Sequence, residues 1–168
     1  MMDLKKQSSR ALHEDHMAGM GILERVDGLL QRHRDGPPVV QDDPEARRVL
    51  VDLKTMVSAE LPPHFDFEEE ELFPHLVELG DGAMVELLTE EHVTLRAAWP
   101  VIADVCQKTI DGAASTEDWR TFRQVAGDFA QTLVSHINKE EMGLLGAIET
   151  MLDDEIDQEA ALIYASSR

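Results

Sequence analysis

A short pattern of histidine and glutamate occurs twice in this sequence and restricts how the chain can fold. The first copy reads HFDFEEEELF from His64, and the second reads HINKEEMGLL from His136. Both follow His-x3-Glu-Glu-x2-Leu, so Glu68 and Glu140 each lie four residues after a histidine. On an α-helix, such residues share one face, with Cβ atoms about 5–6 Å apart. The repetition predicts a metal site built from two related halves of a helical protein.

Helical periodicity covers most of the chain and predicts an all-α, up-down-up-down four-helix bundle with a short C-terminal helical tail. The expected domain is residues 1–168, with the metal-binding bundle at about 10–150 and the tail at about 152–168. Asp43-Pro44 and Ser115-Thr116-Glu117-Asp118 are typical helix starts. Pro62-Pro63 should kink the second helix or shift its start, and Pro100 should kink the third.

Composition excludes several classes of protein. No run of apolar residues reaches the length of a membrane span, and the N-terminus has no apolar core of a secretory signal. A net charge of −19 argues against binding to nucleic acid or to an anionic membrane surface. The single cysteine, Cys106, is expected to be a small buried residue, and a reducing cytoplasm is the expected location.

Each of the four predicted helices carries one histidine within its own apolar stripe, and two of them add a glutamate there. Glutamate is almost never buried unless it is paired or bound to a metal, because burying its charge alone is costly. The pattern therefore predicts two metal ions, each held by two or three imidazoles, with the glutamates bridging them. Imidazole and carboxylate ligands suit iron, manganese or zinc. The predicted ligands are His16, His64, Glu68, His92, His136 and Glu140.

These residues resemble the motifs of the hemerythrin-like family, the HHE cation-binding domains. The resemblance covers roughly residues 10–150. The matching segments are Leu12-x2-Asp15-His16, His64-x3-Glu68-Glu69-x2-Leu72-Phe73-Pro74, Glu91-His92 and His136-x3-Glu140-Glu141. The resemblance implies a non-heme di-iron centre with an oxo or hydroxo bridge, in which Glu68 and Glu140 bridge the irons. It also implies a small ligand, either dioxygen, nitric oxide or peroxide. Zinc or manganese remains an alternative metal.

One position departs from the oxygen-carrying hemerythrins, which have a second histidine one turn from the first on the third helix. Here the residues four away from His92 are Leu88 and Arg96. Two imidazoles, two carboxylate oxygens and one bridge would give each iron about five ligands, which leaves a position for a small ligand at both metals. This favours a sensor or a reactive iron site over a dedicated oxygen carrier.

The remaining histidines and acids have other expected roles. His13 lies one turn before His16, so it is either a fifth imidazole ligand or a residue at the surface or the bundle end. Glu69 and Glu71 are expected on an acidic face, in contact with the ligands, while His33 and His75 are expected to be structural. The ferritin-like di-iron bundles use Glu-x-x-His. No histidine here has a glutamate three residues before it, so that class is excluded.

Three functional hypotheses follow. The first is a di-iron protein that binds dioxygen or a related small ligand for sensing, redox or iron handling. The second is an enzyme that turns over peroxide, nitric oxide or ferrous iron at the same site. The third is a regulatory or interaction bundle with a structural metal, in which the acidic tail binds a protein partner or forms a homodimer.

Overall fold

The computed structural model describes residues 4–167, so Met1–Asp3 and Arg168 of the predicted domain and tail lie outside the described residues. All regular structure in this range is helical, which confirms the all-α prediction. Three of the elements are π-helical turns, written η. The elements are α1 (Gln7–Arg32), α2 (Pro44–Thr55), η1 (Met56–Glu60), α3 (Leu61–Phe67), η2 (Glu68–Leu72), α4 (Phe73–Glu78), α5 (Gly82–Ile110), α6 (Thr116–Lys139), η3 (Glu140–Leu144), α7 (Leu145–Met151) and α8 (Asp154–Ser167).

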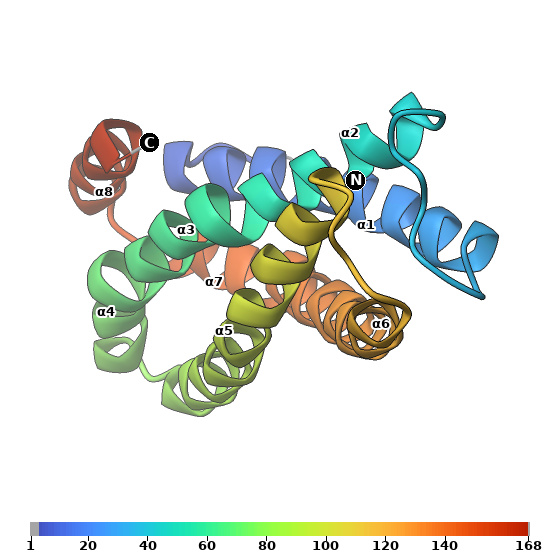
Figure 1. Ribbon diagram of the computed structural model, residues 1–168. Coiled ribbons are helices and arrows are strands. Elements are labelled where there is room, and N and C mark those ends of the chain that lie inside the picture. The colour runs from blue at the N-terminus through green and yellow to red at the C-terminus, as the bar shows by residue number, and fades with distance from the viewer. Residues whose placement is uncertain (1–3, 168) are drawn as a thin grey trace.

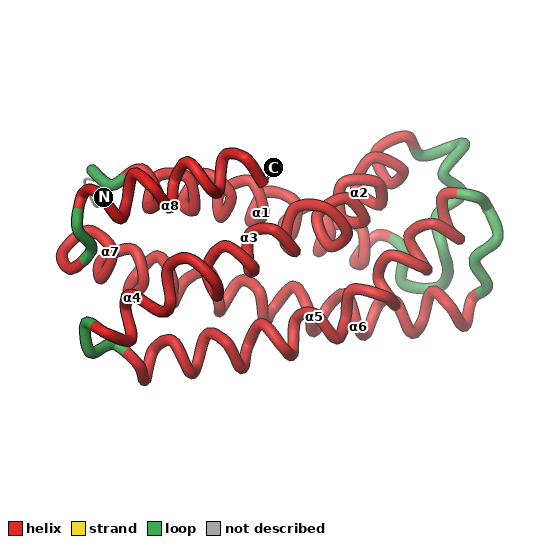
Figure 2. The backbone as a smooth tube through the Cα atoms, turned by 90° about the vertical axis from the view of Figure 1, so that its left-hand side faces the viewer, coloured by secondary structure: helices red, strands yellow, loops and turns green. Residues whose placement is uncertain are grey.

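These elements form four long rods and a shorter helix, α8 (Figure 1). The rods are α1, the continuous series from α2 to α4, α5, and the series from α6 to α7. Both α1 and α5 pack against α2 and α6. The loops that follow α1 and α5 lie at one end, and those that follow α4 and α7 lie at the opposite end (Figure 2). Within residues 4–167, no helix is long and apolar enough to cross a membrane.

The predicted helix starts are confirmed in detail. Asp43 directly precedes Pro44, the first residue of α2, and its side chain accepts a hydrogen bond from the Ala46 N–H. At the start of α6, Ser115 and Asp118 each accept a hydrogen bond from the other's backbone N–H, which is a capping box. These bonds satisfy N–H groups that have no partner inside a helix, so they fix where α2 and α6 begin.

Prolines change the second rod without ending it. Pro62 and Pro63 lie in the first turn of α3, and Pro74 lies in the first turn of α4. Because proline has no N–H, the carbonyl groups one turn earlier lose their α-helical partners. The turn before Pro62-Pro63 widens into η1, and the turn before Pro74 widens into η2. The sequence predicts a kink or a shifted start at Pro62-Pro63, and the structure has the π turn η1 there, directly before α3. Helix α5 also continues through Pro100.

The apolar core consists of two clusters, which lie on either side of a buried polar layer. Along α5, Leu88 belongs to the smaller cluster and Leu95 to the larger, and His92 lies between them. His16 occupies the same kind of position on α1. Close packing on both sides holds these side chains in one layer. Cys106 is fully buried in the larger cluster, as expected, and burial raises the pKa of its thiol to about 12.

Helix α8 packs against α1 and α3 of its own bundle. In the sequence of the tail, Ile156, Ala160 and Ile163 recur at helical spacing, but the structure buries Asp157, Ala160 and Tyr164 and leaves Ile163 39% exposed. Hydrogen bonds of Asp157 determine which face of α8 is buried. Asp157 accepts hydrogen bonds from the backbone N–H groups of Gln7 and Ser8, at 2.8 and 3.0 Å. The tail therefore caps the first turn of α1, and its role in binding a partner stays a prediction.

Replacing Asp157 by alanine is expected to lower the free energy of unfolding by about 1–3 kcal/mol, because two N–H groups in the first turn of α1, that of Ser8 buried, lose their acceptor. Urea denaturation followed by circular dichroism measures this change. Glu159→Ala is the matched control, because Glu159 is exposed on the same helix. Equal stability of the two variants would show that the tail does not cap α1.

Candidate metal centre

The two repeated segments place their histidine–glutamate pairs in the buried polar layer. His64 Nε2 lies 3.5 Å from Glu68 Oε1, and His136 Nε2 lies 2.8 Å from Glu140 Oε1. Both glutamates are fully buried. Each is also the first residue of a π turn, since η2 begins at Glu68 and η3 at Glu140. Such turns within α-helices occur frequently at functional sites.

His16 from α1 and His92 from α5 complete this layer. His16 Nε2 lies 3.0 Å from Glu140 Oε2, and His92 Nε2 lies 3.3 Å from Glu68 Oε2. Both imidazoles are buried. The six predicted ligands thus come together, and they fall into two groups that share both glutamates. One group is His16, His64, Glu68 and Glu140, and the other is Glu68, His92, His136 and Glu140.

The chemistry of these groups fits cation binding. In each group, one atom from every residue lies within 4.8 Å of the others, which is close enough to surround one ion. All four carboxylate oxygens of Glu68 and Glu140 are buried without a partner in hydrogen-bond geometry, and so is His16 Nε2. The neighbouring nitrogens are close but poorly aligned. Buried carboxylates in this state are costly unless they bind a metal.

The outer nitrogens of the four imidazoles are directed at a second set of side chains. His16 Nδ1 lies 2.6 Å from Glu141, His92 Nδ1 lies 2.7 Å from Glu69, and His136 Nδ1 lies 2.9 Å from Glu91. His64 Nδ1 lies 3.0 Å from the Tyr164 hydroxyl and 3.3 Å from Asp15. A carboxylate can only accept, so each Nδ1 carries a proton, and Nε2 is the nitrogen of each ring that could bind a cation in the interior.

Three of these outer carboxylates have a basic partner of their own. Glu69 accepts a hydrogen bond from Arg96 at 2.6 Å, and Glu91 accepts one from Lys139 at 2.6 Å. His13 Nδ1 lies 2.8 Å from Glu141. The partner of Asp15 differs in kind, because there the neutral phenol of Tyr164 donates the hydrogen bond. The support around the centre therefore includes a residue from the C-terminal helix.

The other histidines and Glu69 belong to neither of the two four-residue groups. His13 belongs to neither group, its side chain is 39% exposed, and it contacts Glu141 instead. Glu69 contacts His92, as expected of a residue beside a ligand. His33 Nε2 lies 3.2 Å from Asp43, so it joins the ends of α1 and α2. His75 lies in α4 and is in neither group.

Sequence reasoning missed the supporting roles of Asp15, Glu91, Glu141 and Tyr164. The three acids could have been identified as supporting residues, because each lies next to a predicted ligand in the sequence. Yet each acid supports a histidine on another helix. Glu91 contacts His136, for example, although it precedes His92. No pattern in the sequence indicated Tyr164.

The electrostatics of the layer show how strongly these groups interact. Burial lowers the pKa of His92, but Glu140 and Glu68, together with Glu69, raise it to about 9. Burial raises the pKa of Glu140, but His136 and His16 hold it well below its usual range. Burial and Glu140 raise the pKa of Glu68, but His64 lowers it overall. Both glutamates are therefore anions that require positive charge beside them, which a bound cation supplies.

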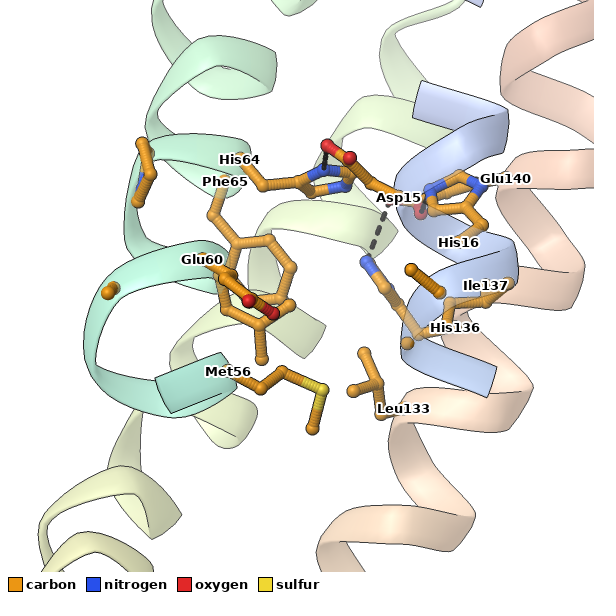
Figure 3. Close-up of a pocket in the computed structure, with 15 residues that line it drawn as sticks. Asp15, His16, Met56, Glu60, His64, Phe65, Leu133, His136, Ile137 and Glu140 are labelled. Carbon is orange, nitrogen blue, oxygen red and sulfur yellow. Dashed lines mark hydrogen bonds and ion pairs between the residues drawn. The ribbon is translucent and has the colours of Figure 1, made fainter. Parts of the chain in front are cut away.

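A cavity of about 350 Å³ reaches the centre from outside (Figure 3). Its inner end is lined by His16, His64, His136 and Glu140, so it meets mainly the first of the two groups. Met56 on η1 and Leu133 and Ile137 on α6 contribute to its apolar walls. Small molecules thus have a route to the buried layer.

Comparison with known proteins agrees with this geometry. The profile of one family, described as the hemerythrin HHE cation binding domain, matches residues 7–148. This range includes all six residues of the two groups and ends before α8. No curated protein sequence matches the chain. Because the match covers most of its length, the chain belongs to the hemerythrin HHE cation-binding family.

Proposed function

We propose that this protein is a non-heme di-iron protein that binds dioxygen or a related small ligand, nitric oxide or peroxide, for sensing, redox or iron handling. The observation that carries the proposal is the pair of four-residue groups that share Glu68 and Glu140. Two ions held in this way would share both carboxylates, in an up-down-up-down four-helix bundle. The metal would supply the electrons that such ligands accept, which zinc does not.

The chain's own residues would bind and orient the ions. His16 and His64 are the proposed imidazole ligands of one ion, and His92 and His136 those of the other. The outer carboxylates keep the proton of each ring on Nδ1, which fixes the tautomer and raises the basicity of Nε2. The apolar clusters on both sides of the layer exclude bulk water.

The absence of a second histidine on α5 distinguishes this site from a dedicated carrier. Leu88 is buried in the smaller apolar cluster, and Arg96 forms ion pairs with Glu69 and Asp66. Neither is available as a ligand, so each ion has only two imidazoles among the described residues. A small ligand would then have a position at both ions, which favours sensing or redox chemistry over simple carriage.

Absorption spectroscopy of iron-loaded protein tests this proposal. Reduced protein exposed to dioxygen should develop near-ultraviolet charge-transfer bands, which azide should change. The double variant His64→Ala/Glu68→Ala should lack them, while His75→Ala, outside both groups, should keep them. Iron-loaded protein without these bands, or bands that persist in the double variant, would contradict the proposal. Steady consumption of peroxide, faster than by free iron, would identify an enzyme instead.

Tyr164→Phe is expected to weaken metal affinity by about 10-fold, since outer partners of ligating histidines typically contribute 10–100-fold. The change removes the hydroxyl that contacts His64 and Asp15 but keeps the ring that stacks on Phe67 at 4.2 Å. Competition with a coloured chelator measures the affinity. Ser166→Ala, exposed on the same helix, should have no effect. Unchanged affinity in Tyr164→Phe would remove the phenol from the account.

A further inference from the structure

The cavity beside the centre is larger than a diatomic ligand requires. Its volume of about 350 Å³ is roughly ten times the volume of one water in the liquid. Pockets for small organic molecules begin at about 300 Å³. Dioxygen or nitric oxide would fill only a small part of this space. The volume is instead suited to an organic molecule with several carbon atoms.

The wall of the cavity is mainly apolar and has one sign of charge. Met56 and Leu133 face each other across it, below the histidines (Figure 3), and Ile137 also lines it. Besides the inner residues, the charged side chains on its wall are Asp15 and Glu60. No lysine or arginine of residues 4–167 lines it. An anionic organic ligand would therefore have no basic side chain to bind, whereas a cation would have a carboxylate.

Glu60 is the carboxylate in position for this. It is the last residue of η1, and its carboxylate points into the cavity beside the Phe65 ring (Figure 3). Asp15, in contrast, is already bound by Tyr164 and lies close to His64. Burial, followed by the nearby charge of Asp52, raises the pKa of Glu60. A bound cation would offset both effects.

We propose that this cavity binds a small organic amine, whose protonated nitrogen pairs with Glu60 while its apolar body lies along Met56, Leu133 and Ile137. The far end of the molecule then lies next to His64, His136 and Glu140. This deepens the proposed function and rests on it, because it names a class of organic ligand or substrate for the same metal centre. A charge-assisted hydrogen bond gives the amine its preference over a neutral molecule of equal size.

Isothermal titration calorimetry with benzylamine tests the proposal at pH 7.5. Benzyl alcohol is the neutral molecule of the same shape, and benzoate is the anionic one. Benzylamine should bind at one site per chain and at least about 10-fold more tightly than benzyl alcohol, with benzoate the weakest. Glu60→Gln should remove this difference and leave benzyl alcohol unaffected. Tighter binding of benzoate, or an unchanged preference in Glu60→Gln, would overturn the proposal.

Two substitutions at the wall test whether binding occurs in this cavity. A Cβ atom at Gly19 would lie 4.0 Å from both Met56 and Ile137, so the leucine in Gly19→Leu would extend between them. Gly19→Leu should abolish binding of benzylamine and of benzyl alcohol. Gly21→Leu is the matched control on the same helix, because nothing lies within 4 Å of a Cβ atom there. Ala59→Leu, at an exposed wall position, should also abolish binding, which separates blocking from misfolding. Wild-type binding in both blocking variants would overturn the proposal.

Iron content measured in the same samples separates this proposal from the proposed function. Protein that takes up no iron but binds benzylamine through Glu60 would contradict the di-iron function and support the amine site. Protein that takes up iron but shows no saturable binding of benzylamine at millimolar concentration would do the opposite.

Discussion

Glu140→Gln is expected to leave the protein unable to hold two metal ions. Glu140 belongs to both four-residue groups and lies 3.0 Å from His16 and 2.8 Å from His136. The neutral amide of glutamine cannot serve as an anionic bridge, so both ions lose a ligand at once. Outer partners alone contribute 10–100-fold, and this inner ligand should contribute more than about 100-fold in affinity. Metal analysis after dialysis should give at most one ion per chain.

Two further variants make this result specific. Glu68→Gln should have the same effect, because Glu68 is the other shared carboxylate. Glu70 lies two residues after Glu68 and is exposed, so Glu70→Gln should retain both ions. Two ions per chain in Glu140→Gln, bound with wild-type affinity, would contradict the shared-bridge arrangement.

Removing the metal from the wild-type protein is expected to lower its Tm by about 8–16 °C. An ion present at 1,000 times its Kd stabilises the folded state by about 4 kcal/mol. In a domain of this length, each kcal/mol shifts Tm by about 2–4 °C. The physical reason is the buried layer. Without a cation, Glu68 and Glu140 depend on protonated histidines for compensation of their charges.

Differential scanning calorimetry with and without a strong chelator measures this shift. The control is the double variant Glu68→Gln/Glu140→Gln, whose Tm should not respond to the chelator because it binds no metal pair. A wild-type Tm that the chelator leaves unchanged would show that metal binding is not coupled to folding. A shift of equal size in the double variant would show that the chelator acts elsewhere.

Helical periodicity was sufficient to predict which six side chains meet. A residue's place in an apolar stripe determines the face on which it lies, and the packing of four helices then brings those faces together. His16 and His92 could be identified in this way although neither has a distinctive local motif. The repeated His-x3-Glu likewise predicted that the glutamates would be shared, since each repeat contributes one carboxylate to a common layer.

The contacts around the ligands could not be predicted in the same way, because they depend on how the helices rotate against one another. Glu91 lies directly before His92 on α5 but supports His136 on α6. His13 had two open interpretations, and only the position of Glu141 across the interface distinguishes them. The contacts of Tyr164 depend on where the tail packs, and the hydrogen bonds of Asp157 turn the buried face of α8 away from Ile163.

The most direct test of the account is the metal content of the protein purified without added metal, measured by mass spectrometry beside the protein concentration. The protein should contain about two iron ions per chain, in keeping with two groups that share their carboxylates. Glu140→Gln should lose iron, and Glu70→Gln should not. Protein that contains no iron and takes none up on reconstitution, or that binds zinc in place of iron, would contradict the account.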